Sequence, residues 1–351
     1  MPNTTAYLEK LAAPLQIGNL TLSHRTGFAP MAGFTDAACR DLMAAHGAGY
    51  TVSEMVSAKA IVYGDRKTIK LLQAKPNGAL YGVQMFGEEP KYFAQAAAEI
   101  VQYPFDFFDI NMGCPAPKIV GTGAGSRLMA DPDLCGRIVE AVVSQAQGRP
   151  VTVKMRKGWD DTSITAVEVA KACVQAGAAM VTVHGRTREQ MYTPGLVDLD
   201  IIRQVKEAVN VPVFGNGDVD SAEKALTMLA ETGCDGIAVA RGALGDPWLF
   251  ERINAAIEGR PAPAEPNLQA RMNALRRQVA QMVEEKGEYI AMPQARAQAI
   301  HYMKGLRGAA GLRRGCCGLS HLSDVDDLIA DVFAAQRHAA DPDDQREVPF
   351  P

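Results

Sequence analysis

The chain has 351 residues, of which 47% are hydrophobic, and its formal charge is −4. This size and composition exclude a disordered chain and fit one barrel of about 250 residues with a smaller appendage. The longest apolar runs are shorter than the ~18 residues of a membrane helix, and residues 1–10 lack a charged-then-apolar leader, so we expect a cytoplasmic protein without a membrane anchor.

The first part of the chain alternates short β-branched or aromatic runs with stretches of helical spacing, which is typical of repeated βα units. A hairpin over residues 15–25, with a Gly18-Asn19 turn, comes first and is expected to cap the bottom of a barrel. The predicted strands are Thr26–Pro30, Gly49–Glu54, Leu80–Met85, Phe105–Asn111, Val151–Met155, Met180–His184, Val211–Gly215 and Gly236–Ala240. The predicted helices include Pro90–Val101, Asp133–Gln147, Ser163–Ala176, Asp200–Ala208 and Ala222–Thr232. Eight such units predict an α/β fold, a closed parallel (β/α)8 TIM barrel over residues 1–258.

The pattern changes after residue 258. Residues 259–267 (GRPAPAEPN) are rich in proline and predict a linker. Residues 268–340 show helical spacing without a strand signal, which predicts a C-terminal helical bundle domain, and residues 341–351 are expected to form a flexible tail. Residues 267–317 hold nine Lys/Arg and three acids, a local charge of +6. A local basic surface of this kind is what binding to nucleic-acid phosphates needs, whatever the net charge.

Glycine and basic residues follow the last two predicted strands, at Asn216-Gly217-Asp218 and Ala240-Arg241. Because the functional groups of such a barrel lie at the carboxyl ends of its strands, and late strands commonly bind phosphate, these residues favour a phosphorylated ligand. Turn formation alone is the alternative for either motif.

Three polar residues lie at the ends of otherwise apolar predicted strands. Lys154 is placed to stabilise negative charge on a bound flavin ring, although an inward lysine paired with a carboxylate is an equal alternative. Gln84 and His184 can add hydrogen bonds to a ring or a phosphate, and a structural role is the alternative for the histidine. Together with the phosphate signals they favour flavin mononucleotide (FMN), whereas no GxGxxG motif indicates a Rossmann unit.

Cys114 is singled out among seven cysteines by its position. It follows the fourth predicted strand, between Gly113 and Pro115, on a constrained turn at the active face. A nucleophile, an acid and a buried small hydrophobe all remain open for it. The cysteines form no CxxC pair, so we expect reduced thiols, no disulfide framework and no metal site.

Several segments, in this order, carry a resemblance to a known family: PMAGFTD, VSEMVSAKA, VQMFG, DINMGCPAPKIV, GAGSRLM, VKMRKGW, VHGRTREQMY, FGNGDV and GCDGIAVARGALGDPWLF. Together they resemble the bacterial tRNA-dihydrouridine synthases, closest to the B-type branch. The resemblance covers about residues 13–255 and continues more loosely into the helical region.

The resemblance implies FMN as cofactor, NADPH as electron source and tRNA as substrate. It implies an FMN site formed by Pro30, Met31, Ala32, Gln84, Lys154, His184, Asn216, Gly217, Asp218, Ala240 and Arg241. Reduced flavin would deliver hydride to C6 of uracil while Cys114 protonates C5. Asn111 would position the uracil or the flavin, Arg186 and Arg188 would touch the RNA backbone, and Arg296 would contact RNA from the helical domain.

The chain departs from the family pattern at basic positions. Residues 121–123 (GTG) offer none where the family commonly has one, and Arg127 stands nearby where a small residue is typical. Residues 193–200 (TPGLVDLD) lack the basic residue and the tryptophan that the family often has in this segment. In the helical region an Arg-Lys-His cluster is reduced to Arg296, Ala297 and Gln298.

Two other functions fit parts of the sequence. A flavin barrel that reduces a free pyrimidine or enone would need the same strand ends but no basic helical domain. A catalytically silent RNA-binding or folding factor would keep the fold and lose basic contacts, as at residues 121–123.

Overall fold

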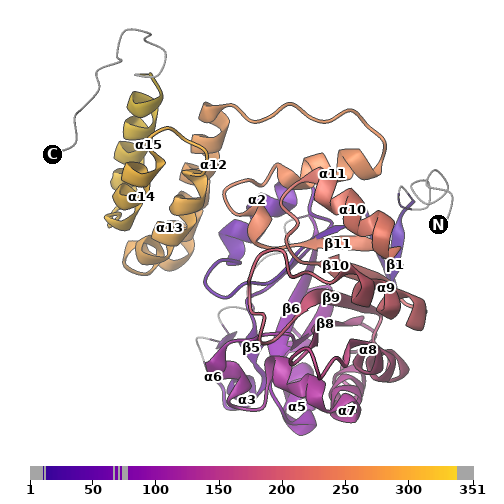
Figure 1. Ribbon diagram of the computed structural model, residues 1–351. Coiled ribbons are helices and arrows are strands. Elements are labelled where there is room, and N and C mark those ends of the chain that lie inside the picture. Colours follow the sequence, from indigo (N-terminus) through magenta and orange to yellow (C-terminus); the bar gives the residue numbers. More distant parts are fainter. Residues whose placement is uncertain (1–10, 12, 66–67, 70–71, 73–77, 338–351) are drawn as a thin grey trace. The chain divides into compact units, whose positions relative to one another are not determined.

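The computed structural model describes residues 11, 13–65, 68–69, 72 and 78–337. The chain divides into two compact units, one of Met1–Ala243 with Pro247–Ala264, and one of Leu244–Asp246 with Glu265–Pro351. Figure 1 shows the course of the chain through both. The expected tail at 341–351, and the last three residues of the expected helical domain, lie outside the described residues.

Eight parallel strands close the first unit into a barrel. They are β3 (Thr26–Phe28), β4 (Tyr50–Val52), β6 (Leu80–Phe86), β7 (Phe107–Met112), β8 (Val151–Gly158), β9 (Met180–Thr187), β10 (Val213–Asn216) and β11 (Gly236–Val239). The strand order is β4-β3-β11-β10-β9-β8-β7-β6, and a β4–β6 pairing closes the ring. A two-residue strand, β5 (Val56–Ser57), also pairs with β6. The predicted (β/α)8 barrel is confirmed.

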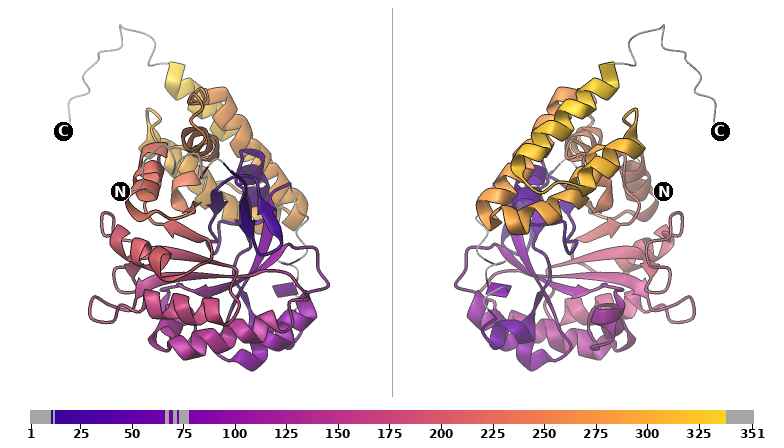
Figure 2. Two further views of the ribbon diagram at one scale, coloured as in Figure 1. Left: turned by 90° about the vertical axis from the view of Figure 1, so that its right-hand side faces the viewer. Right: turned by 90° about the vertical axis from the view of Figure 1, so that its left-hand side faces the viewer.

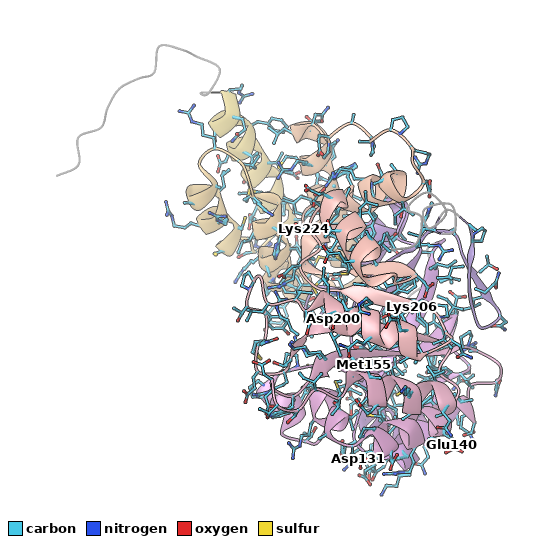
Figure 3. All side chains as sticks on the ribbon, turned by 45° about the vertical axis from the view of Figure 1, so that its right-hand side comes forward. Asp131, Glu140, Met155, Asp200, Lys206 and Lys224 are labelled. Carbon is cyan, nitrogen blue, oxygen red and sulfur yellow. The ribbon has the colours of Figure 1, made fainter. Side chains whose placement is uncertain are left out.

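Helices surround this barrel. They are α2 (Ala37–Ala45), α3 (Ala58–Val62), α5 (Pro90–Ile100), α6 (Pro117–Val120), α7 (Pro132–Val143), α8 (Ala166–Gln175), α9 (Leu199–Ala208), α10 (Ala222–Thr232) and α11 (Leu249–Ile257), with 3-10 turns η1 (Gly125–Ala130) and η2 (Arg241–Ala243). Side-chain caps fix where several begin: the Asp131 carboxylate accepts from the Leu134 N–H and the Ser221 hydroxyl from the Lys224 N–H. Figure 3 shows charged residues of the outer helices, such as Glu140 and Asp200, which are exposed.

The hairpin of β1 (Leu15–Ile17) and β2 (Leu20–Leu22) closes the amino-terminal end of the barrel. Ile17 and Leu22 are buried in one cluster with Met180 and Phe214, which lie early in β9 and β10. Gly18 has a φ of +59°, and a Cβ there would lie 2.8 Å from a side-chain carbon of Pro150, just before β8. The prediction that this hairpin caps the barrel is therefore confirmed, and the opposite end is left for a site.

Strands β8 and β9 are longer than the sequence predicts. They continue past Met155 and His184 to Gly158 and Thr187, with an irregular register between Arg156 and Gly158. Lys154 and His184 therefore lie within strands rather than at their ends. The extension reflects tertiary bonds, because the Arg156 guanidinium donates to the Thr187 carbonyl oxygen at 2.7 Å.

The second unit is helical, as the sequence predicts. It contains α12 (Leu268–Lys286), α13 (Glu288–Tyr302), α14 (Ala309–Cys317) and α15 (Leu322–Arg337), coloured orange to yellow in Figure 2. Its core contains Leu275 and Val325, both fully buried. The buried Tyr302 hydroxyl donates to Gln278 Oε1 at 2.9 Å, which satisfies one polar group inside the bundle.

Candidate active site

Inward-facing polar side chains from neighbouring strands meet in the carboxyl half of the barrel. Asn111 on β7 is paired in register with Lys154 on β8, Arg156 on β8 with His184 on β9, and His184 with Asn216 on β10. Because side chains alternate along a strand, Lys154 and Arg156 point to the same side of the sheet. Lys154 and Arg156 are two residues apart in β8, so their side chains belong to two successive layers of polar groups inside the barrel.

A buried hydrogen-bond network fixes the side chain of Gln84. Asp109 accepts from Gln84 Nε2 and from the Thr152 hydroxyl, each at 2.6 Å, and Gln84 Oε1 accepts from Asn111 Nδ2 at 2.8 Å. Burial raises the pKa of Asp109 to about 6, against the hydrogen bonds from Thr152 and Gln84 and the charge of Lys154. Asp109 is not among the site residues predicted from the sequence. Its position two residues before Asn111 in the same strand was the available signal.

Asn111 holds the loop that carries Cys114. Its Oδ1 accepts from the N–H groups of Gly113 at 3.1 Å and Cys114 at 2.9 Å. On the far side of the loop, the backbone N–H and hydroxyl of Ser126 both donate to the Cys114 carbonyl oxygen at 3.0 Å. Gly125 has a φ of +62°, and a Cβ there would lie 2.7 Å from that oxygen, so glycine is needed for this approach. The half-buried Cys114 thiol is free and sits on a fixed loop.

Arg156 is a second anchor of the same loop and is not among the site residues predicted from the sequence. It is 2% exposed, its Nε donates to the Gly113 carbonyl oxygen at 2.9 Å, and its terminal nitrogen donates to the Thr187 and Met191 carbonyls at 2.7 and 2.9 Å. Burial, with the nearby Arg186 charge, lowers its pKa to about 10, so it stays a cation at neutral pH. One buried side chain therefore joins the loop after β7 to the loop after β9.

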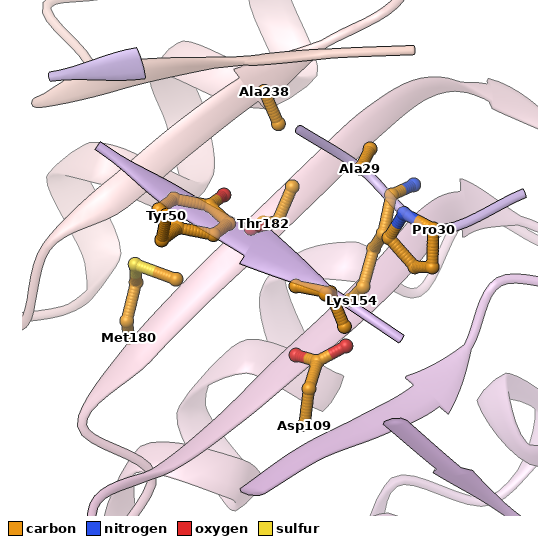
Figure 4. A pocket seen from close by; sticks show the side chains of 9 residues that line it. Ala29, Pro30, Tyr50, Asp109, Lys154, Met180, Thr182 and Ala238 are labelled. Atoms are coloured by element: carbon orange, nitrogen blue, oxygen red, sulfur yellow. The ribbon is translucent and has the colours of Figure 1, made fainter. Parts of the chain in front are cut away.

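Lys154 lines a small pocket inside the barrel with Asp109, Pro30, Tyr50 and other residues of the wall (Figure 4). Its Nζ donates to Asn216 Oδ1 at 3.0 Å. Among the described residues no carboxylate oxygen lies within 4 Å of it, so the structure does not show the lysine–carboxylate pair that the sequence left open. Burial first, and then the charge of Arg156, lower the pKa of Lys154 to about 8.

The ends of β9 and β10 carry an ion-pair network. Arg186 donates to His184 Nε2 at 3.2 Å and pairs with Asp218, whose second oxygen faces Arg241 at 3.5 Å. Burial, and then the charges of Lys154 and its neighbouring arginines, hold the pKa of His184 well below its usual range. Its imidazole is therefore neutral, with Nε2 as acceptor. Burial alone would raise the pKa of Asp218, but the hydrogen bonds from Arg186 and the Gly195 N–H lower it.

Two of the expected site residues are already paired within this network. Arg186 is fully buried and pairs with Asp218, and its expected contact with an RNA backbone stays a prediction. The Asp218 carboxylate is used by arginines, which leaves its backbone rather than its side chain to face a ligand. Gly217 has a φ of +131°, and a Cβ there would lie 2.7 Å from Val197, so this turn requires glycine.

The remaining expected residues are distributed as follows. Pro30, Met31 and Ala32 follow β3 and range from half-buried to exposed, whereas Ala240 and Arg241 follow β11. In the second unit Arg296, on α13, is half-buried and donates to the Leu319 carbonyl oxygen at 2.9 Å. Its neighbour Gln298 is buried. Part of the Arg296 guanidinium therefore has a structural partner within its own unit.

A parallel eight-stranded barrel with convergent Lys, Arg, His and Asn side chains at its carboxyl end, and a free thiol on an anchored loop, defines a (β/α)8-barrel enzyme. A family model described as "Dihydrouridine synthase (Dus)" matches residues 27–337. The chain therefore belongs to the dihydrouridine synthase family.

Individual relatives agree with this assignment. The chain is 38% identical over 322 residues to a "Probable tRNA-dihydrouridine synthase" of Rickettsia conorii, covering 92% of this chain and 97% of that protein. It is 39% identical over 326 residues to "tRNA-dihydrouridine synthase B" of Pseudomonas aeruginosa, covering 92% and 96%. The resemblance inferred from the sequence, including its B-type branch, is confirmed.

Solved structures of low identity support the fold. Morphinone reductase in complex with tetrahydroNAD matches with a TM-score of 0.51 at 16% identity, covering 74% of this chain and 93% of that one. The old yellow enzyme from Trypanosoma cruzi matches with a TM-score of 0.52 at 13% identity, covering 75% and 96%.

In the described part of the chain, no helix is both long and apolar enough to cross a membrane. The same residues contain no group of three or more His, Cys, Asp or Glu side chains arranged to hold a metal ion.

Proposed function

We propose that this protein reduces the C5–C6 double bond of uridine in tRNA to dihydrouridine, with FMN as cofactor and NADPH as reductant, in the cytoplasm. The observation that carries the proposal is the Cys114 thiol, fixed by Asn111, Ser126 and Arg156 beside a cationic barrel mouth. The names of the relatives, which specify tRNA, support the substrate.

The charge balance of the mouth fits a phosphorylated, anionic cofactor. The cations near His184 are Lys154, Arg156, Arg186 and Arg241; Asp218 pairs with the last two, and Asp109 lies near Lys154. In addition, Arg186 Nε is buried without a hydrogen-bond partner in the described structure, and an anion would satisfy it. A flavin phosphate is the anion that we propose for this place.

We propose that FMN is held at the residues inferred from the sequence. Gln84 and Lys154 would face the ring, while His184, Asn216, Gly217, the Asp218 backbone, Ala240 and Arg241 would lie toward the phosphate, and the backbone of residues 30–32 would contact the ring edge. The network from Asp109 orients the Gln84 amide before the cofactor binds. The neutral His184 ring leaves its second nitrogen as a hydrogen-bond donor.

Bound and reduced, FMN supplies a hydride, which would form the new C–H bond at C6 of uracil. The chain's contribution is the proton at C5. Cys114 donates it from its thiol as the C5–C6 double bond is lost, and the thiolate then regains a proton from water. Asn111 and Arg156 set the position of the thiol through the backbone of its loop.

Purified protein tests the proposal at its first step. We expect a yellow preparation that releases FMN on denaturation and whose absorbance bleaches with NADPH. A colourless protein that takes up no added FMN would contradict the flavin proposal.

The pH dependence of flavin reduction tests the role of Lys154. Because its pKa is about 8, its cation is present below that pH and is lost as the pH rises through it. We expect the rate of flavin reduction by NADPH to fall above pH ~8, by up to about tenfold per pH unit. Stopped-flow measurement of flavin bleaching between pH 6 and 10 gives this profile.

Lys154→Met is the matched variant for this profile. It removes the titrating charge and keeps much of the side-chain volume, so its flavin should be reduced more slowly at low pH and without the fall near pH 8. An unchanged fall in the variant would assign the titration to another group.

A further inference from the structure

Two arginines stack on one tryptophan at the rim of the barrel. The guanidinium carbon of Arg127 lies 5.2 Å from the Trp159 ring centroid, and that of Arg188 lies 4.8 Å from it. Arg127 belongs to η1, Trp159 follows β8 and Arg188 follows β9. Cation–π contact of this kind orients each guanidinium plane without neutralising its charge.

Neither arginine has an ion-pair partner among the described residues. The two acids that follow Trp159 are engaged elsewhere: Asp160 accepts from the Thr162 N–H and hydroxyl, and Asp161 accepts from Gln190 Nε2. Arg188 Nε is buried without a hydrogen-bond partner in the described structure. Two positive charges thus lie on one indole ring without an ion-pair partner among the described residues, in a chain whose net charge is −4.

The stack is built into the scaffold of the Cys114 loop. Arg127 directly follows Ser126, which donates twice to the Cys114 carbonyl oxygen. Trp159 follows the strand of Arg156, which holds the Gly113 carbonyl oxygen. Two backbone hydrogen bonds join the segment after β9 to the end of β8. The Arg188 N–H donates to the Gly158 carbonyl oxygen at 2.9 Å, and the Glu189 N–H donates to the Trp159 carbonyl oxygen at 3.1 Å. The stack is therefore tied through the backbone to the loop that carries Cys114.

We propose that Arg127, Trp159 and Arg188, the arginine clamp, bind a phosphodiester group of the RNA strand next to the uridine held at Cys114. This inference rests on the proposed function. A phosphodiester fits because it carries one negative charge and accepts the forked N–H groups of guanidinium. The indole holds both forks in place before RNA arrives, which lowers the entropy lost on binding.

Equilibrium binding of an unmodified tRNA transcript to the FMN-loaded protein, measured by fluorescence anisotropy across salt concentrations, tests the clamp. Arg127→Ala and Arg188→Ala should each weaken binding about fivefold at 0.1 M salt and reduce the salt slope by about 0.7, as for one lost phosphate contact. Arg137→Ala is the matched control, because it removes an exposed arginine from the outer helix α7 and should change neither value. Equal effects at all three positions would overturn the clamp.

Trp159→Leu separates orientation from charge. Both arginines remain, so the salt slope should stay at the wild-type value while affinity falls, because the guanidinium groups lose their platform. Wild-type affinity in this variant would overturn the three-residue arrangement. Thermal melting and flavin content show whether each variant is folded.

A phosphate of NADPH is the other source of the same chemistry. Stopped-flow bleaching of the flavin by NADPH should be unchanged in Arg127→Ala and Arg188→Ala, and a selective loss of that step with wild-type tRNA binding would overturn the RNA assignment. Because binding is measured without turnover, a wild-type protein that binds tRNA but forms no dihydrouridine would contradict the proposed function and leave the clamp result interpretable.

Discussion

Cys114→Ala is expected to lower the rate of dihydrouridine formation by about 10²–10⁴-fold, the range that one positioned acid contributes. The thiol is the proton donor that we assign at C5, and alanine has no proton to give. Flavin reduction by NADPH precedes that step and should keep its wild-type rate. Single-turnover reoxidation of reduced protein by tRNA, measured separately from reduction, gives both numbers.

Cys317→Ala is the control for this variant. Cys317 is an exposed free thiol in α14 of the helical unit, so its loss should change neither half-reaction. If Cys114→Ala slowed reduction and reoxidation equally, the acid role would fail, because a proton donor to uracil takes no part in flavin reduction.

Arg156→Met is expected to lower kcat for tRNA about 10²-fold, since misplacing a reacting group by about 1 Å costs that much. Arg156 acts as a positioning residue through the backbone of the Cys114 loop. The variant leaves the carbonyls of Gly113, Thr187 and Met191 without this donor, so the free energy of unfolding should also fall by about 3 kcal/mol. Chemical denaturation and steady-state kinetics measure the two effects.

Comparing kcat for tRNA with the rate of flavin reduction distinguishes a positioning role of Arg156 from general instability. At a temperature where the variant is folded and flavin-loaded, kcat for tRNA should drop while flavin reduction by NADPH stays within a few-fold of wild type. Arg156→Lys keeps the charge but loses the fork that serves three carbonyls, so it should restore little activity. Wild-type kcat in the folded Arg156→Met protein would contradict the role of Arg156 in positioning the Cys114 loop.

The barrel could be predicted because the sequence patterns of its strands, helices and turns are local. Alternating apolar runs and helical spacing identify each βα unit, and the Gly18-Asn19 turn identifies the hairpin at its bottom. The lengths of β8 and β9 could not be predicted, because they depend on the Arg156 side chain meeting carbonyls of the next strand and loop.

The candidate site likewise contains residues that could be identified from the sequence and residues that could not. Cys114 and Lys154 stand out because the sequence places a thiol and a cation where the barrel opens. The burial of Arg186 depends on Asp218, 32 residues later, and a contact of that range leaves no sign in the spacing. The importance of Asp109 likewise arises from its neighbours across two strands. Partners across the barrel therefore decide which charged residues remain free for a substrate.

The most direct test of the account is the reaction itself. Purified FMN-loaded protein is incubated with an unmodified tRNA transcript and NADPH, and nuclease digests of the RNA are analysed by mass spectrometry. We predict that defined uridines gain two hydrogen atoms, only when NADPH is present, and that free uracil is reduced far more slowly. Oxidation of NADPH with every uridine unchanged, or equal rates on uracil and tRNA, would contradict the account.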